Sequence, residues 1–220
     1  MLGDGSIGLV NPDTMVYDLV ANFFGSPRDN VTPFTAIASN YSKKVMGLYI
    51  EDALIYFVFL RGNQAMIRKL QSDCLFDSKP NKITQFKKLD GTILCMETSM
   101  DDNIFFAGGS SQFELTKGVA KVFAITFDED IDLITDITLP NNIVNTMGVS
   151  DMNRMKGVDV LLVGTNAALF VVEWTGSHFV ILHQIEDIHS WLVNNIKQIG
   201  NVCFTVSHKD NHINRITFYS

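Results

Sequence analysis

Cysteine is scarce in this chain of 220 residues, and its three copies lie far apart. Cys74, Cys95 and Cys203 form neither the dense pairs of a disulfide framework nor the ligand spacing of a zinc site. Their neighbours are apolar, so we expect small buried hydrophobic residues in a protein of a reducing compartment.

Positive charge is also in short supply. Lys and Arg total 17 against 24 Asp and Glu, a formal net charge of −7. This balance argues against a general nucleic-acid binder and against a polybasic membrane-surface protein. The first residues lack the basic and apolar regions of a signal peptide, and the longest apolar run, Ala53 to Leu60, is too short to span a bilayer. We therefore expect a cytoplasmic protein, with a cytoskeletal, ciliary or nuclear assembly as open alternatives.

Short apolar runs dominate what is present. Hydrophobic residues make up 46% of the chain, and 16 residues are Phe, which is typical of a folded domain. The runs are rich in Val, Ile, Phe and Tyr and end in Asp, Asn, Gly or Ser. Long faces of helical period are nearly absent. This pattern predicts an all-β fold of strands joined by hairpin turns.

The runs also repeat. First strands are expected near Val45, Thr92, Val144 and Leu192, and pairs of second and third strands follow at 53–60 and 64–70, 103–110 and 119–126, 158–166 and 168–174, and 201–208 and 212–218. Four strands at a step of about 50 residues are the unit of a β-propeller blade. We predict a β-propeller of four-stranded antiparallel blades, an incomplete ring of about 17 strands in about four to five blades or part-blades.

The predicted units follow one another in a single domain of residues 1–220. A part-blade at 1–24 precedes blades at 45–89, 92–139 and 144–187, and a part-blade at 190–220 ends the chain. Both part-blades carry a third strand, so the two do not complete one blade. Open propeller edges expose unpaired backbone and apolar surface. We therefore expect the remainder of a longer propeller, or a neighbouring chain, to close the ring.

The stretch 187–199 has two interpretations. Ile188, Trp191, Leu192 and Ile196 keep the three- and four-residue spacing of an amphipathic helix. A strand preceded by a polar loop fits the repeat better, and we favour it.

Small-residue stretches end two of the expected second strands, Ala107-Gly108-Gly109-Ser110 and Val163-Gly164-Thr165-Asn166. Glu173-Trp174 ends a third strand, and His189-Ser190 precedes a first strand. With the repeat, these features make the chain resemble the WD40-like β-propeller superfamily over nearly its whole length. The sequence has no Trp-Asp dipeptide, which departs from the pattern of that family. The resemblance implies structural roles within blades for Trp174 and His189, the histidine as a hydrogen-bonding residue.

Motifs typical of catalytic, metal or cofactor sites match the sequence only in part. Gly3 to Gly8 matches G-x-G-x-x-G, but a dinucleotide site needs a strand before the motif and a helix after it, and Pro12 prevents that helix. The acidic stretch 128–132 lacks the glycine and the distal Glu of a calcium loop and is interpreted as a hairpin turn. His178, His183 and His189 are spaced wrongly for one metal. No nucleophile motif is present. We expect no catalytic residue, no cofactor and no metal.

Charge is distributed unevenly. Residues 61–88 carry seven Lys and Arg against two Asp, whereas residues 97–136 carry nine acidic against two basic residues. Such polarity can orient a protein in an assembly.

The expected function is a non-catalytic protein–protein interaction scaffold in a larger intracellular complex, with a hydrolase-like enzyme site in the central channel and an RNA-associated propeller as alternatives. The candidate interaction surface comprises Lys79, Lys82, Phe86, Lys87 and Lys88.

Overall fold

The structure is a computed structural model. It describes residues 6–10, 17–22, 36–39, 44–51, 54–61, 82–85, 92–101, 104–112, 117–127, 131–150, 153 and 156–219, and up to residue 92 it describes the backbone alone. The elements formed by these residues are seventeen β-strands, all paired antiparallel. In this part of the chain no helix has the length and apolar character needed to cross a membrane. The chain divides into two compact units, Met1–Lys88 and Leu89–Ser220, which are described separately.

The first unit contains a pair of strands and a four-stranded sheet. β1 (Ser6–Val10) pairs with β2 (Tyr17–Asn22), as expected for the first 24 residues. The sheet has the order β3 (Ala36–Ser39), β4 (Lys44–Glu51), β5 (Leu54–Arg61) and β6 (Lys82–Gln85). The strand that begins near Val45 was expected to be the first of its sheet, and this was wrong, because β3 precedes β4 and pairs with it. The strand expected at 64–70 lies outside the described residues.

The second unit contains three sheets, each in sequence order. The first comprises β7 (Thr92–Thr98), β8 (Ile104–Ser110), β9 (Ala120–Phe127) and β10 (Ile131–Leu139). The second comprises β11 (Thr146–Val149), β12 (Asp159–Gly164), β13 (Leu169–Trp174) and β14 (Phe179–Ile185). The third comprises β15 (Asn195–Ile199), β16 (Val202–Val206) and β17 (Ile213–Thr217). The all-β prediction and the blade-like sheets are confirmed.

The segment 187–199 is not a helix. Its last residues form β15, and Leu192 makes an isolated antiparallel bridge to Asn166. Tertiary pairing with β16 and with the preceding sheet therefore decides between the two interpretations, and the strand that we favoured is confirmed.

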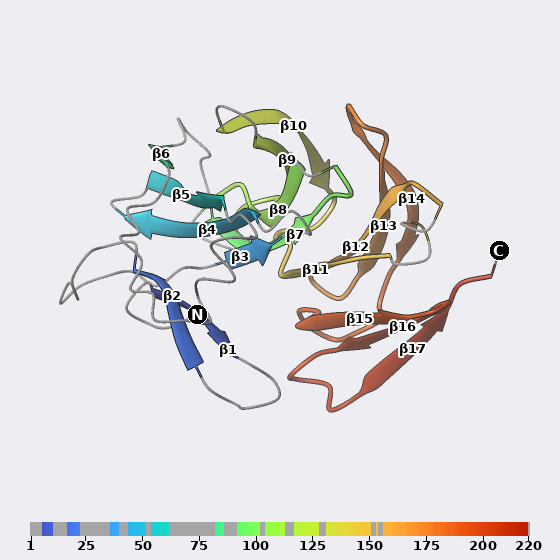
Figure 1. Cartoon of the computed structure of the whole chain (residues 1–220). Helices are drawn as coiled ribbons and strands as arrows, with labels where there is room; N and C mark the ends of the chain where they lie inside the picture. Colours follow the sequence, from blue (N-terminus) through green and yellow to red (C-terminus); the bar gives the residue numbers. More distant parts are fainter. Residues whose placement is uncertain are drawn as a thin grey trace. The chain divides into compact units, whose positions relative to one another are not determined.

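The three sheets of the second unit follow one another like blades. Their first strands lie side by side, with β11 between β7 and β15 (Figure 1). Alternate residues of β12 point to opposite faces, as the period of a strand requires. Leu161 and Val163 enter the core shared with β8 and β9, and Val160 and Leu162 enter the core shared with β15 and β16. The inner strands β12 and β13 are therefore covered on both faces, whereas most residues of β14 are exposed.

Two glycines allow the sheets to approach each other. A Cβ at Gly108 would lie 2.6 Å from Val144 Cγ1, and a Cβ at Gly164 would lie 2.9 Å from Val193 Cγ1. Both distances are too short for any larger side chain. The small-residue stretches end second strands as expected, with Gly108 inside β8 near its end and Gly164 as the last residue of β12. Close packing of the following segment against these strands, more than turn geometry, explains the glycines.

Candidate functional site around His189

His189 lies in the connection between β14 and β15, and its side chain has no exposed surface. Its Nδ1 atom is 2.8 Å from Asp210 Oδ2, and its Nε2 atom is 2.9 Å from Thr205 Oγ1. Asp210 lies in the turn between β16 and β17, and Thr205 is a fully buried residue of β16. The histidine therefore bonds the β14–β15 connection to two parts of the third sheet.

Asp210 is bonded on several sides. It accepts hydrogen bonds from the Ser190 hydroxyl and from the Ser190 backbone N–H, the latter at 2.9 Å. The Ser190 hydroxyl, followed by the Ser190 N–H and His189, lowers the pKa of this carboxyl, although partial burial opposes them. An ionised carboxylate only accepts hydrogen bonds. Nδ1 of His189 therefore donates its proton to Asp210 Oδ2, and Nε2 forms the second bond, to the Thr205 hydroxyl.

Thr205, His189 and Asp210 have the bonding order of a hydrolytic triad, in which a hydroxyl, an imidazole and a carboxylate form a chain. Chemistry would require a substrate to reach Thr205 Oγ1. Thr205 has 0% of its surface exposed, and its neighbour Cys203 is part of the core between the second and third sheets. These contacts therefore indicate a structural role for His189, as the sequence resemblance implies. We call His189, Ser190, Thr205 and Asp210 the His189 clamp.

The preceding sheet has a simpler version of this clamp. Asn141 lies in the connection between β10 and β11, and its Nδ2 donates to Thr165 Oγ1 at 2.5 Å and to the Asn166 carbonyl at 3.1 Å. It thus binds the β12–β13 turn of the sheet that follows it. One amide makes this link, whereas the third sheet uses an imidazole and a carboxylate.

Backbone hydrogen bonds attach the same connections to the sheet before them. The Val144 N–H donates to the Gly109 carbonyl at 2.9 Å, and the Val193 N–H donates to the Thr165 carbonyl at 3.0 Å. The Ala167 N–H also donates to the Trp191 carbonyl at 2.9 Å. Residues 188–193 are therefore hydrogen-bonded both to the second sheet, at its β12–β13 turn, and to the third sheet.

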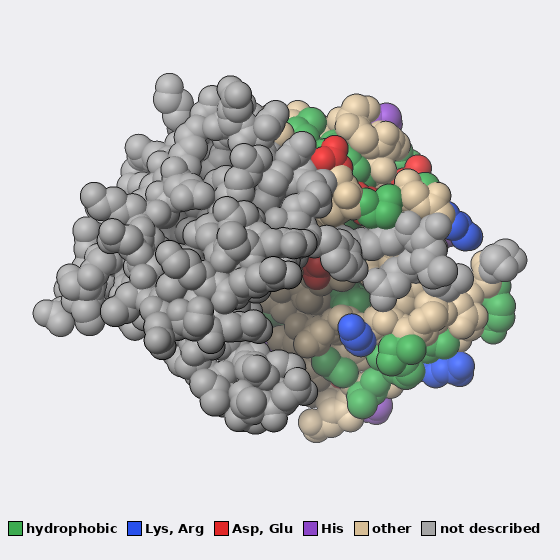
Figure 2. All heavy atoms as spheres, viewed as in Figure 1, with side chains coloured by type: hydrophobic (Ala, Val, Ile, Leu, Met, Phe, Trp, Pro, Cys, Tyr) green, Lys and Arg blue, Asp and Glu red, His purple; other side chains and the backbone are tan. Residues whose placement is uncertain are grey.

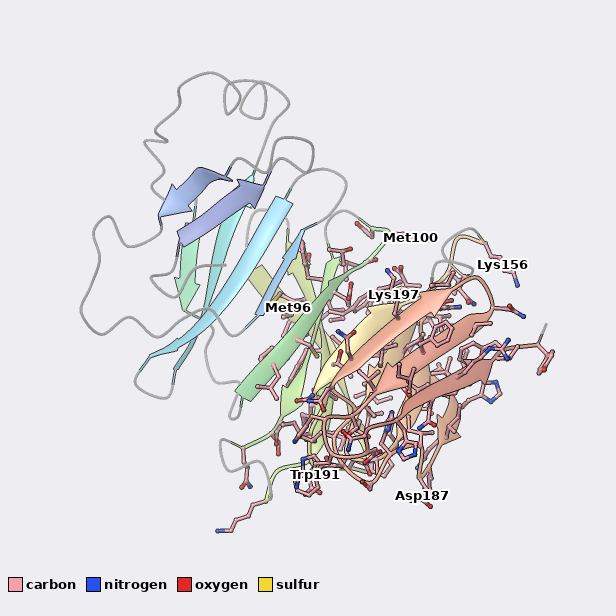
Figure 3. All side chains as sticks on the ribbon, turned by 90° about the horizontal axis from the view of Figure 1, so that it is seen from below. Met96, Met100, Lys156, Asp187, Trp191 and Lys197 are labelled. Atoms are coloured by element: carbon pink, nitrogen blue, oxygen red, sulfur yellow. The ribbon has the colours of Figure 1, made fainter. Side chains whose placement is uncertain are left out.

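The clamp supports an exposed aromatic side chain. Trp191 is 42% exposed, and Lys209 Nζ lies 3.6 Å from the centre of its ring, which is a cation–π contact. Trp191 follows His189 and Ser190, and Lys209 precedes Asp210, so both members of the pair flank bonded residues. Figure 3 places Trp191 at the same end of the unit as Asp187.

The opposite end carries Met100 and Lys156 (Figure 3). Asp159, the first residue of β12, is 5% exposed there and accepts hydrogen bonds from the Ser99 hydroxyl and from the Met100 N–H. A buried carboxylate requires such donors. Asp159 thus joins the β7–β8 turn of the first sheet to the second sheet.

The structure places the other predicted residues as follows. Trp174 ends β13, and its ring packs against Phe179 and Phe106 at centroid distances of 4.9 Å and 5.9 Å. His178 lies in an exposed turn and bonds to Thr175, and His183 lies in β14. Among the described residues, no three His, Cys, Asp or Glu side chains gather as metal ligands.

The predicted interaction surface cannot be placed. Lys82 is the first residue of β6, whose side chains are not described, and Lys79, Phe86, Lys87 and Lys88 lie outside the described residues. Residues 128–130 of the acidic stretch also lie outside them, although β9 and β10 pair on either side as the hairpin interpretation expects.

The cysteines that the structure describes are poor nucleophiles. Burial raises the pKa of the Cys203 thiol to about 11. Burial, and next the Glu97 carboxylate, raise the pKa of the Cys95 thiol, while a hydrogen bond to the Gly108 carbonyl opposes them. Both thiols are free, and their reactive thiolate forms are disfavoured at neutral pH. Cys74 lies outside the described residues.

Sequence reasoning missed the partners of His189 and the buried Asp159. Asp210 stands in a Lys-Asp-Asn turn between two expected strands, and Thr205 is a polar residue in an apolar strand. A polar residue at a core position of a strand was the available signal, because such a residue needs a buried partner.

Comparison with known proteins assigns no family to the chain. No family model matches the chain, and no curated protein matches it. A crystal structure of a protein from Lactobacillus plantarum, a target of the Northeast Structural Genomics Consortium, is similar with a TM-score of 0.42 and 8% sequence identity. The match covers 96% of this chain and 76% of that chain. No functional statement follows from a likeness of this size.

Proposed function

We propose that this chain is a non-catalytic protein–protein interaction scaffold of the WD40-like β-propeller type, acting in the cytoplasm as part of a larger assembly. The observation that carries the proposal is the buried His189 clamp, which fixes a connection that exposes Trp191. Rigid, exposed aromatic residues favour binding because little ordering entropy is lost on association.

The WD40-like assignment is supported by position. A histidine in the connection before a first strand bonds to the second strand and to the turn that follows it, which is the role that the resemblance implies for His189. The triad-like chain at His189 lends no support to the alternative of a hydrolase with a site in the central channel, because the Thr205 hydroxyl of this chain is inaccessible.

The test is affinity capture of the full-length protein from native extract, with crosslinking mass spectrometry and quantification of the co-purifying proteins. We expect a stable set of partners and crosslinks through Lys209. Trp191→Ala should lower the affinity for these partners by about thirtyfold, and their recovery with it, since a central aromatic anchor contributes on the order of 2 kcal/mol. Crosslinks through Lys79, Lys82, Lys87 or Lys88 would locate a contact on the first unit.

The matched control is Tyr219→Ala, because Tyr219 is 90% exposed and lies outside the clamp. Recovery should not change in this variant. A solitary protein, or an equal set of partners with Trp191→Ala, would contradict the proposal.

A further inference from the structure

We infer that Trp191 and Lys209 form one binding site, which we call the Trp–Lys pair. Its ligand is a segment of a partner protein in which a carboxylate stands next to an apolar side chain. The inference rests on the proposed scaffold function and deepens it, because it names the chemistry that the partner presents.

The two side chains of the Trp–Lys pair are stacked and open to solvent. Lys209 Nζ lies 3.6 Å from the centre of the Trp191 ring, and both residues are exposed. The cation–π contact holds the ammonium on the ring, but an ammonium has three N–H groups, and those that point away from the ring can donate to another acceptor. The pair therefore presents an apolar ring and a cation side by side.

The charge of Lys209 is not neutralised by a nearby carboxylate. Among the residues that the structure describes, Lys209 forms no ion pair. The carboxylate next to it in sequence, Asp210, accepts hydrogen bonds from Ser190 and His189 instead. An external carboxylate can therefore form a charge-assisted hydrogen bond with Lys209 without displacing a partner inside the chain.

The backbone on each side of Lys209 is attached to the connection that carries Trp191. The His208 N–H donates to Asn194 Oδ1 at 2.9 Å, and the Ser190 N–H donates to Asp210 Oδ2 at 2.9 Å. Ser190 and Asn194 stand on either side of Trp191 in the sequence. The two members of the pair are thus positioned before a ligand arrives, so binding loses little ordering entropy.

The second sheet supports the same connection with strained backbone. Ala167, in the β12–β13 turn, has a φ of 61°, a left-handed conformation that residues with a Cβ rarely adopt. Its N–H donates to the Trp191 carbonyl at 2.9 Å, and its carbonyl accepts from the Ile188 N–H at 2.9 Å. Strained residues persist where surrounding contacts require them, and they cluster at binding sites. The strain at Ala167 therefore supports a site at Trp191.

The place of the pair separates it from surfaces that another sheet would cover. Trp191 lies in the connection between the second and third sheets, and both of these sheets are in place. Sheets of this unit contact one another through their faces. In the connection between the first and second sheets, Pro140 is exposed although the sheets on both sides of it are packed together. A further sheet packed in this manner would leave Trp191 open.

Other anionic ligands fit the pair less well. A nucleic acid or an anionic membrane needs several cations together, but Leu89–Ser220 carries seven Lys and Arg against 16 Asp and Glu. On the face shown in Figure 2, the visible Lys and Arg side chains of the described residues lie singly among other types. One carboxylate needs only one cation, and an apolar side chain beside it can pack on the exposed part of Trp191.

The experiment uses the full-length protein with the proteins that co-purify from native extract, and a carbodiimide as the crosslinker. A carbodiimide joins a lysine to a carboxylate only where the two are in direct contact, and mass spectrometry identifies the linked residues. We expect Lys209 to be linked to an Asp or Glu of another protein, with an apolar residue next to it in sequence. A mixture of isotope-labelled and unlabelled chains distinguishes links to a second copy.

A synthetic peptide that spans the linked carboxylate is then the probe for binding by fluorescence anisotropy. Lys209→Gln should weaken binding by about fivefold, and Lys209→Arg should keep it within about twofold of the wild type because it retains the charge. Trp191→Ala should weaken binding by about thirtyfold. The matched control is Lys156→Gln, which removes an exposed cation at the opposite end of the unit (Figure 3) and should leave binding unchanged.

Circular dichroism confirms that each variant is folded, and partner recovery from extract is measured for all of them. Links from Lys209 to residues 1–88 of the same chain or to a second copy would overturn the inference, as would recovered partners without a link at Lys209. Recovery that falls with Trp191→Ala and is unchanged with Lys209→Gln would remove the carboxylate and leave the proposed scaffold function in place. Recovery unchanged in both variants would contradict the proposed function itself.

Discussion

The β11–β14 and β15–β17 sheets differ in their strand sequences and in their surroundings. In β13 every side chain except Glu173 is buried, whereas in β17 none is. β12 and β13 are nearly continuous apolar runs, as expected for strands buried on both faces, whereas β17 mixes apolar and polar residues. Apolar cores cover both faces of β12 and β13, whereas among the described residues β15–β17 packs against the second sheet on one face. A blade in this unit thus gains its core from the sheets next to it.

The largest difference between the two sheets should appear on truncating a central Phe in each. Phe170 of β13 is fully buried, so Phe170→Ala should lower the free energy of unfolding by about 3–5 kcal/mol. Phe204, on the face of β16 opposite Cys203 and Thr205, is half-buried, so Phe204→Ala should cost about 1–2 kcal/mol. Urea unfolding of the full chain measures both. Equal losses of free energy in the two variants would show that Phe204 is buried as fully as Phe170.

The clamps of the two sheets can be compared next. His189→Ala leaves the buried Thr205 hydroxyl without its partner and should cost about 1–3 kcal/mol. Asn141→Ala removes one partly buried amide and should cost about 1 kcal/mol. Thermal unfolding ranks the two variants. A larger loss for Asn141→Ala would mean that the clamp of the third sheet contributes less than its bonds indicate.

A methyl group tests how tightly the second and third sheets meet. Gly164→Ala places a Cβ 2.8 Å from Thr146 Cγ2 and 2.9 Å from Val193 Cβ, and such overpacking should cost about 1–3 kcal/mol. Gly148→Ala is the matched control, because its nearest neighbour would lie at 3.7 Å, and it should change stability by less than about 0.5 kcal/mol. Equal effects on urea unfolding would contradict close packing at Gly164.

The smallest effect concerns pH. Hydrogen bonds lower the pKa of Asp210 in the folded chain, so its contribution to stability is fully present above the pKa of the unfolded residue, about 3.9. It is lost as the pH falls through the lower folded value. Asp210→Asn should therefore be less stable than the wild type at neutral pH, and the gap should close below about pH 3.9. A gap that stays constant in acid would exclude Asp210 ionisation as its cause.

Much of the second unit follows from local pattern. Hairpin turns bracket apolar runs from Thr92 to Thr217. The predicted first, second and third strands agree with β7–β9, β11–β13 and β15–β17, because within each sheet every strand pairs with the next one in sequence. The same reasoning misplaced Val45 within its sheet, because β3 has only four residues and offers little periodicity.

The site was predictable only in part. His189 and Trp174 could be selected by resemblance, since Trp174 ends a strand and His189 stands in the connection before a first strand. The contacts from Ser99 to Asp159 and from Asn141 to Thr165 join residues far apart in the sequence and in different sheets. Their meeting depends on how sheets stack, which no local spacing encodes.

The links from Val144 to Gly109 and from Val193 to Thr165 use main-chain atoms at both ends. Any residue except proline supplies these groups. The attachment between sheets therefore has two parts, backbone links that persist whatever the residue and side-chain links that depend on Asn141 and His189. Selection should retain those two residues and the two glycines, whose missing side chains no other residue can reproduce.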